Sequence, residues 1–329
     1  MASSHAKLVK DLANSRKILD AITSRVYNDS IYSVAMALWE RHLSVKNPQW
    51  KYLSFRTFHI IKGQETAHVM AFTDTRLPGI GMVGYFGATS VSIGAEVLEK
   101  ACQWHKKNGL SRVYGPINGT LPSDYRLNSK DDYLIPGEPV NPIWYKESFR
   151  LAGFTVFNRY VSGRIKRFDI VLKFAFRKAP KLEGTLRVRK FNDNEYDKDF
   201  YTYHVLRNKI FPHMSIYCPA ISLAERRYIS PGKFDTNYTF FLMDGSRAIG
   251  FVMAYVHHGS LIIKTIAVLP EYRGRGLSRI LAKVVHDKAA SHGIKTAVYA
   301  MVREGNQVYA NRHLLARVIR RYCTMYRVL

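Results

Sequence analysis

The chain has 329 residues, enough for about two domains, with 47% hydrophobic residues and a formal net charge of +25. This composition excludes global disorder, no apolar run is long enough to cross a bilayer, and the N-terminus MASSHAKLVK lacks a secretory hydrophobic segment. The positive charge is spread over both halves and favours anionic partners such as nucleic acid, anionic lipid or an acidic protein, unless it serves solubility alone.

The first half is expected to contain a long helix followed by strands and turns. The helix covers residues 7–27, and Asn47-Pro48 marks a turn. The expected strands lie at 55–61, 68–72, 82–88 and 112–114. Between the last two strands, Ser92 caps a helix with one apolar face, and Gly109 ends it.

The second half repeats this order. Its expected strands lie at 186–191, 240–243, 249–256, 262–268 and 297–301. A helical stretch follows the first strand, Ser222 caps a short helix, and Asp244-Gly245 turns a hairpin. Segments 105–115 and 287–300 each combine a helix end, a capping glycine and a strand with Val-Tyr. This weak internal similarity predicts two related folds in tandem.

The stretch 261–285, LIIKTIAVLPEYRGRGLSRILAKVV, combines a buried strand, a glycine loop and a helix. The loop contains Arg273, Gly274, Arg275 and Gly276. Glycine lets the backbone turn tightly and lets a ligand approach the main chain, and free N–H groups at a helix start suit a phosphate. The stretch lacks the residues of a P-loop or of a Rossmann fingerprint. We favour a pyrophosphate site over a merely structural turn with solvated arginines.

The segment VLPEYRGRGLSRIL resembles the signature loop of the GNAT acyltransferases, Arg/Gln-x-x-Gly-x-Gly/Ala. Here it runs Arg273-x-x-Gly276-x-Ser278, and Ser278 departs from the last position while remaining small. In that family the loop binds the pyrophosphate of coenzyme A, and the preceding strand pairs with the pantetheine arm. The resemblance therefore implies acetyl-CoA or another acyl-CoA as cofactor, bound by Ile266, Ala267, Val268, Arg273, Gly274, Arg275, Gly276, Leu277, Ser278 and Asn306.

The resemblance covers roughly residues 50–329, and the segments IGMVGYFGA, KKNGLSRVYGPIN, NPIWYKESFRLAGF and RRYCTMYRVL resemble a long bacterial group with two such folds in tandem. It implies an α/β (α+β) class in which each fold is a mixed, mostly antiparallel sheet flanked by helices. We expect domains at 1–178 and 179–329, joined by a basic, proline-containing connector at 177–181. The first fold has FGATSVSIGAE in place of the loop. It is therefore expected to hold no coenzyme A, and to form a wall of the substrate cleft or a scaffold.

In the family, Asn-x-x-Ala-x-x-Leu-Tyr follows the next strand, and its tyrosine protonates the leaving thiolate. Here Asn306 matches the first position, His313 replaces the tyrosine, and Tyr309 stands at the alanine. The expected catalytic residues are His313, which as a histidine titrates near neutral pH, and Tyr309, with Tyr322 as the next choice. A surface histidine and a core tyrosine are the alternative interpretations.

The general base stays open. No Asp or Glu lies between residues 261 and 270. His257 or His258, Tyr203, His204 or a water relay are all compatible with the sequence.

Two function classes remain. The first is an N-acyltransferase that moves an acetyl or longer acyl group from acyl-CoA to a small-molecule or peptide amine, in the cytoplasm. An acidic acyl carrier protein is an alternative donor, attracted by the positive charge. The second class is a nucleic-acid-binding module with a vestigial coenzyme A site, because RVIRRYCTMYRVL interleaves aromatic and basic residues. The intact loop favours the enzyme, and the three scattered cysteines suit a reduced compartment without a zinc site.

Overall fold

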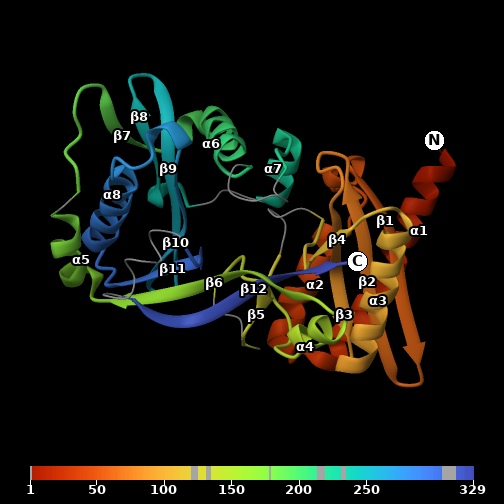
Figure 1. Cartoon of the computed structure of the whole chain (residues 1–329). Helices are drawn as coiled ribbons and strands as arrows, with labels where there is room; N and C mark the ends of the chain where they lie inside the picture. The colour runs from red at the N-terminus through yellow and green to blue at the C-terminus, as the bar shows by residue number, and fades with distance from the viewer. Residues whose placement is uncertain are drawn as a thin grey trace. The chain divides into compact units, whose positions relative to one another are not determined.

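Figure 1 shows the computed structural model, which describes residues 2–119, 125–130, 135–177, 179–212, 219–230, 235–305 and 316–329. The chain forms two compact units. One comprises chiefly Met1–Arg159 with Tyr322–Leu329, and the other chiefly Tyr160–Ile216 with Ala220–Arg321. Within the described ranges, no helix is long and apolar enough to cross a membrane.

The compact units do not coincide with the division expected at residue 178. Strand β6 (Thr155–Lys166) runs into the second unit and pairs there with β11 (Thr296–Arg303). The last strand, β12 (Arg317–Val328), leaves the second unit and pairs with β4 (Arg112–Gly115) of the first. The boundaries of the compact units therefore follow the pairing of β6 and β12 and not the position of the connector. That two related folds divide at residue 178 stays a prediction.

The sheet of the first unit is mostly antiparallel. Its strands run in the order β1 (Leu53–Lys62), β2 (Glu65–Asp74), β3 (Gly81–Ala88), β4 and β12, and the short β5 (Leu127–Asn128) also pairs with β12. Among the strand pairings described in this unit, β3 with β4 alone is parallel. Such a pair needs a crossover connection, and the connection here contains helix α3 (Val91–Lys107).

Helices cover both faces of this sheet. On one face α1 (Ala2–Val26) lies so close to β3 that a Cβ on Gly87 would meet Leu19 at 2.9 Å. A second helix, α2 (Asp29–His42), packs beside α1. On the other face α3 and α4 (Tyr145–Leu151) enclose a core in which the rings of Phe86 and Phe149 lie 5.2 Å apart.

The expected start of α3 is wrong by two residues. Its N-cap is Ser90, and Ser92 lies inside the helix. Its apolar positions recur at helical spacing and are buried, which is why the helix forms. At its other end Gly109 has a φ of +77°, a conformation that glycine adopts without strain, so this glycine ends the helix as expected.

The second unit repeats the order of three antiparallel strands, a helix and a parallel strand, but it has an additional strand at residues 186–190. Its strands run β7 (Leu186–Lys190), β8 (Thr239–Asp244), β9 (Arg247–His257), β10 (Ser260–Val268), β11 and β6. Of the described pairings in this unit, β10 with β11 alone is parallel, and α8 (Leu277–Ser291) connects these two strands. Figure 1 shows α8 and α6 (Tyr196–Ile210) on opposite faces of the strands, and α5 (Phe168–Phe176) beside α8. The expected mixed, mostly antiparallel sheets flanked by helices are confirmed.

Two local expectations in this unit are also confirmed. Ser222 caps α7 (Leu223–Ile229) in a reciprocal capping box: its Oγ accepts from the Glu225 N–H, and the Glu225 carboxylate accepts from the Ser222 N–H. The hairpin between β8 and β9 turns at Gly245, which has a φ of +55°.

A buried ion pair ties α6 to β7. The Asp199 side chain is 1% exposed and accepts from both Nη atoms of Arg189, at 2.6 and 2.7 Å, and from the Asn192 N–H at 2.7 Å. Asp199→Asn is expected to lower the free energy of unfolding by about 2 kcal/mol, less than for a fully buried pair because Arg189 is partly solvated.

Urea unfolding measures this change. The control is Glu195→Gln, which removes a surface carboxylate paired with Lys198 and should change stability little. If both substitutions lowered the free energy of unfolding equally, the burial of Asp199 would not explain its contribution to stability.

Candidate functional site

In the second unit β10 and β11 separate along their length. They pair only at residues 260–263 and 296–299. On its other edge β10 stays paired with β9 as far as Val268, with a bulge at Lys264. From Thr265 onward, one edge of β10 therefore has no strand partner in the part of the chain that the structure describes.

Backbone alternation decides which groups face this open edge. The Leu269 N–H donates to the Ile249 carbonyl of β9 at 2.8 Å. Residues two apart point their backbone groups to the same edge, so Ala267 also faces β9. Ile266 and Val268 then face the open edge, where the Val268 carbonyl accepts from Arg273 Nε at 3.3 Å. Three residues were expected to hold a pantetheine arm. The backbone groups of Ile266 and Val268 face the open edge, whereas those of Ala267 face β9.

The loop after β10 uses two left-handed glycines. Gly274 has a φ of +80°, and Gly276, the N-cap of α8, has a φ of +71°. A Cβ on Gly274 would meet nothing within 4 Å, whereas one on Gly276 would lie 3.3 Å from Pro180. Because the N-cap is a glycine, no side chain caps the first N–H groups of α8. This helix start can therefore accept an anion.

The side chains around the loop are mainly basic. Arg273, Arg275 and Ser278 are exposed, whereas Leu277 is buried and contributes only its backbone N–H. No acidic residue stands in the first turn of α8. Tyr272 supports the loop by donating to the Asp244 carboxylate at 2.8 Å, and the Arg275 guanidinium lies 5.7 Å from its ring centre. The loop thus presents positive charge and uncapped N–H groups together.

The expected catalytic residues cannot be placed. Asn306, Tyr309 and His313 lie outside the described residues. Tyr322, the next choice, is buried in the first unit, where its hydroxyl donates to the Glu138 carboxylate at 2.6 Å. This bond makes Tyr322 a structural residue rather than an available acid.

The structure separates the four residues considered as general base. His257 pairs with Ser260, so it and His258 lie at the end of β10 that is remote from the loop. Tyr203 is buried and accepts from Arg207 Nη1 at 2.8 Å. Burial, followed by the charge of Arg226, lowers the pKa of His204. The lowered pKa favours the neutral form of His204, which is the form that a proton acceptor needs.

The corresponding place in the first unit is filled by the chain itself. Beyond the short parallel pairing of β3 and β4, the Ile117 N–H donates to the Val83 carbonyl at 2.9 Å. Asn118 Oδ1 accepts from the Tyr85 N–H at 2.6 Å. At the start of α3, Ser90 donates to the Glu65 carboxylate. The edge groups of β3 that would pair with a donor arm are thus already bonded within the chain, although Ser90 makes no capping hydrogen bond at the start of α3.

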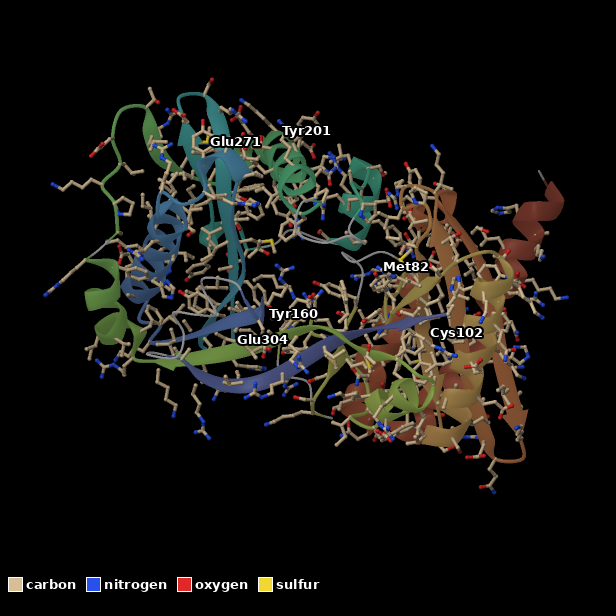
Figure 2. All side chains as sticks on the ribbon, viewed as in Figure 1. Met82, Cys102, Tyr160, Tyr201, Glu271 and Glu304 are labelled. Carbon is tan, nitrogen blue, oxygen red and sulfur yellow. The ribbon has the colours of Figure 1, made fainter. Side chains whose placement is uncertain are left out.

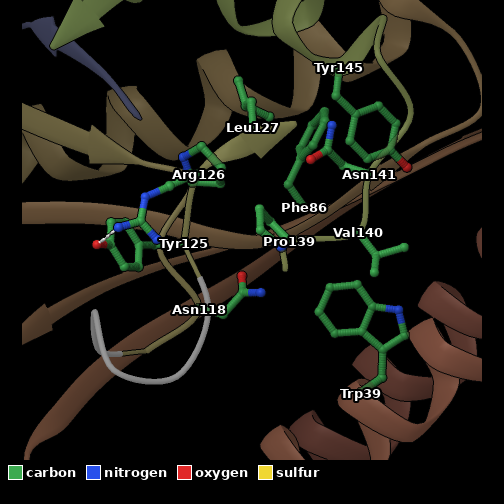
Figure 3. Close-up of a pocket in the computed structure, with 11 residues that line it drawn as sticks. Trp39, Phe86, Asn118, Tyr125, Arg126, Leu127, Pro139, Val140, Asn141 and Tyr145 are labelled. Atoms are coloured by element: carbon green, nitrogen blue, oxygen red, sulfur yellow. Dashed lines mark hydrogen bonds between the residues drawn. The ribbon is translucent and has the colours of Figure 1, made fainter. Parts of the chain in front are cut away.

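Figure 3 shows a pocket beside this filled edge. Its wall consists of Trp39, Phe86, Pro116, Asn118, Tyr125, Arg126, Leu127, Pro139, Val140, Asn141 and Tyr145. Its volume is about 30 Å³. A cavity of that size holds a water or two, so it admits neither a nucleotide nor an acyl arm.

Sequence reasoning missed a second feature, a groove beside the loop lined by Lys209, Arg247 and Arg273 among others. These cations come from α6, from the start of β9 and from the loop. No spacing in the sequence brings them together. In the sequence, the excess of positive charge is the one signal that indicates clusters of basic side chains.

Comparison with known proteins identifies the family. The model of the acetyltransferase (GNAT) family matches residues 206–313, which include the loop. No curated protein matches the chain. A tandem GNAT protein from the clavulanic acid biosynthesis pathway is 10% identical, with a TM-score of 0.53, over 95% of this chain and 94% of that one.

Two further solved structures are similar. A conserved protein from Enterococcus faecalis V583, described as a probable N-acyltransferase, is 11% identical with a TM-score of 0.52. A GCN5-related N-acetyltransferase from Anabaena variabilis is 10% identical, also with a TM-score of 0.52. Each alignment covers 97% of this chain and 70% of the other. At such identities these structures show the fold alone, which is that of tandem GNAT proteins. The family match assigns residues 206–313 to the GNAT acetyltransferase family, and the solved structures show a tandem GNAT fold over most of the chain.

Proposed function

We propose that the second unit transfers an acetyl or longer acyl group from acyl-CoA to an amine by direct attack. The observation that carries this proposal is the open edge of β10, which leads directly into an uncapped helix start between two left-handed glycines. Acyl-CoA supplies the activated thioester. The chain supplies binding and orientation, which account for most of the acceleration when no covalent intermediate forms.

Each part of the site has a role in this proposal. The free backbone groups of Ile266 and Val268 align the pantetheine arm as an added strand would. The N–H groups of Leu277 and Ser278, with Arg273 and Arg275, hold the pyrophosphate. Arg273 then exchanges its bond to the Val268 carbonyl for the phosphate. The amine must attack as the neutral base, and its proton passes to His204 or to water.

The leaving thiolate needs a proton, for which we propose His313 or Tyr309. Either His313→Ala or Tyr309→Phe is expected to lower turnover at saturating donor by about 100-fold. Tyr322→Phe is the control, because its hydroxyl already bonds Glu138 and should not affect chemistry. Full turnover in both test variants would make this assignment wrong.

Release of free thiol from acetyl-CoA in the presence of a panel of amines tests the reaction itself. We expect amine-dependent release together with the mass of an acetylated product. Release that is the same with and without amines, from a chain that binds acetyl-CoA, would contradict acyl transfer to an amine.

The nucleic-acid alternative finds no specific support. It rested on the alternating basic and aromatic residues of the C-terminal strand. In the structure Arg320 and Tyr322 of that strand are buried. These two side chains are therefore not available to a nucleic-acid surface.

A further inference from the structure

The groove beside the loop has a volume of about 430 Å³ and is lined by Lys209, Arg247, Leu269, Pro270, Glu271 and Arg273. Lys209 stands in the last turn of α6, Arg247 begins β9, and the other residues follow β10. Figure 2 labels Glu271 at this end of the second unit. All these residues belong to one compact unit.

The groove has more positive than negative charge. Its one carboxylate, Glu271, accepts from Arg247 Nη2 at 2.7 Å. Its own backbone N–H, then Arg247 and Lys209, lower the pKa of Glu271, so it is charged at neutral pH. Lys209 and Arg273 form no salt bridge among the described residues, although the charge of Lys209 acts on Glu271. Three cations and one carboxylate leave a local charge of about +2, which suits a phosphate monoester of charge near −2.

The groove and the loop share Arg273. A ligand whose pyrophosphate lies on the loop can therefore reach the groove with another phosphate of the same molecule. Coenzyme A carries such a group, the 3′-phosphate on its ribose. A phosphopantetheine arm on a carrier protein has neither the pyrophosphate nor the 3′-phosphate.

We propose that this groove binds the 3′-phosphate of coenzyme A and so selects free acyl-CoA over a carrier-bound donor. The inference rests on the proposed function, because the loop must first hold the pyrophosphate. Lys209 is its main determinant, since it is exposed, forms no salt bridge in the described chain and takes no part in the loop. Arg247 offsets the charge of Glu271 through their ion pair.

Calorimetric titration with coenzyme A and with 3′-dephospho-coenzyme A tests the groove. The full chain is expected to bind the dephosphorylated compound about 10-fold more weakly, as for the loss of one exposed charge-assisted contact. Lys209→Gln should weaken coenzyme A binding by a similar factor and leave binding of the dephosphorylated compound unchanged. The control is Lys295→Gln, an exposed lysine just before β11 at the remote end of the strands, which should leave both affinities unchanged.

The outcomes separate this inference from the proposed function. If the full chain binds both compounds equally, or if Lys209→Gln weakens both equally, the groove does not recognise the 3′-phosphate and the proposed function stands. If neither compound binds, both the inference and the proposed function fail. Turnover with matched donors completes the test: we expect acyl-CoA to be preferred and Lys209→Gln to reduce that preference. Preference of the full chain for the carrier-bound donor would overturn the inference.

Discussion

Gly276→Asp is expected to weaken binding of coenzyme A at least about 100-fold, equivalent to ~2.7 kcal/mol. Two effects combine. The φ of +71° strains any residue with a Cβ, and that Cβ would lie 3.3 Å from Pro180 of the connector, so the loop must shift. The new carboxylate also stands at the N-cap of α8, where it would bond the N–H groups proposed to hold the pyrophosphate. Calorimetry on the full chain measures the loss.

Gly293→Asp is the matched control. Gly293 has a φ of +75° just after the other end of the same helix, and a Cβ there would meet nothing within 4 Å. It reproduces the backbone strain without touching the loop, so coenzyme A affinity should stay within about twofold of the original. Unchanged affinity in Gly276→Asp would place the donor elsewhere.

Lowering the pH from 7.5 to 5 is expected to destabilise the fold by several kcal/mol. Burial is the main cause that lowers the pKa of His42 to about 3 and those of His68, His105 and His286 to about 4. In the unfolded chain each titrates near 6.5. Below that pH these histidines bind protons in the unfolded state but stay neutral in the folded state. The stability is therefore complete above pH 6.5 and is lost as the pH falls toward 4, at roughly 2 kcal/mol per histidine by pH 5.

Urea unfolding across this pH range measures the loss. His68 is fully buried, and one ring nitrogen already bonds the Tyr85 carbonyl at 2.8 Å, so a second proton has no partner in the described structure. His68→Gln should lower the stability at pH 7.5 but flatten its fall toward pH 5. A stability that is constant from pH 7.5 to 5 would contradict the burial of these side chains.

The loop and its flanking strand and helix were predictable because their signals are local. A β-branched run, two glycines and a helical apolar pattern lie within 25 residues, and the structure places β10, the loop and α8 there. Helix α2 was missed although its signal is present. Asn28 caps it by accepting from the Ile31 N–H, and Ile31, Ala35 and Trp39 recur at a spacing of four.

Other features depend on tertiary packing that local patterns do not encode. Strands β6 and β12 each join a sheet far from their neighbours in sequence, so the compact units end at other places than the connector. In the first unit, the edge of β3 is occupied because Asn118 accepts a hydrogen bond from Tyr85, which lies 33 residues earlier in the sequence. The cationic groove likewise depends on Lys209 and Arg247 meeting the loop.

Hydrogen–deuterium exchange of the full chain with and without acetyl-CoA tests the central claim most directly. We expect slower exchange in residues 266–280, covering the free edge of β10, the loop and the first turn of α8. The corresponding residues 84–95 of the first unit should exchange at unchanged rates, because the Tyr85 and Ala88 N–H groups at the edge of β3 are already bonded within the chain. Protection of residues 84–95, with none at 266–280, would contradict the assignment of the donor site to the second unit.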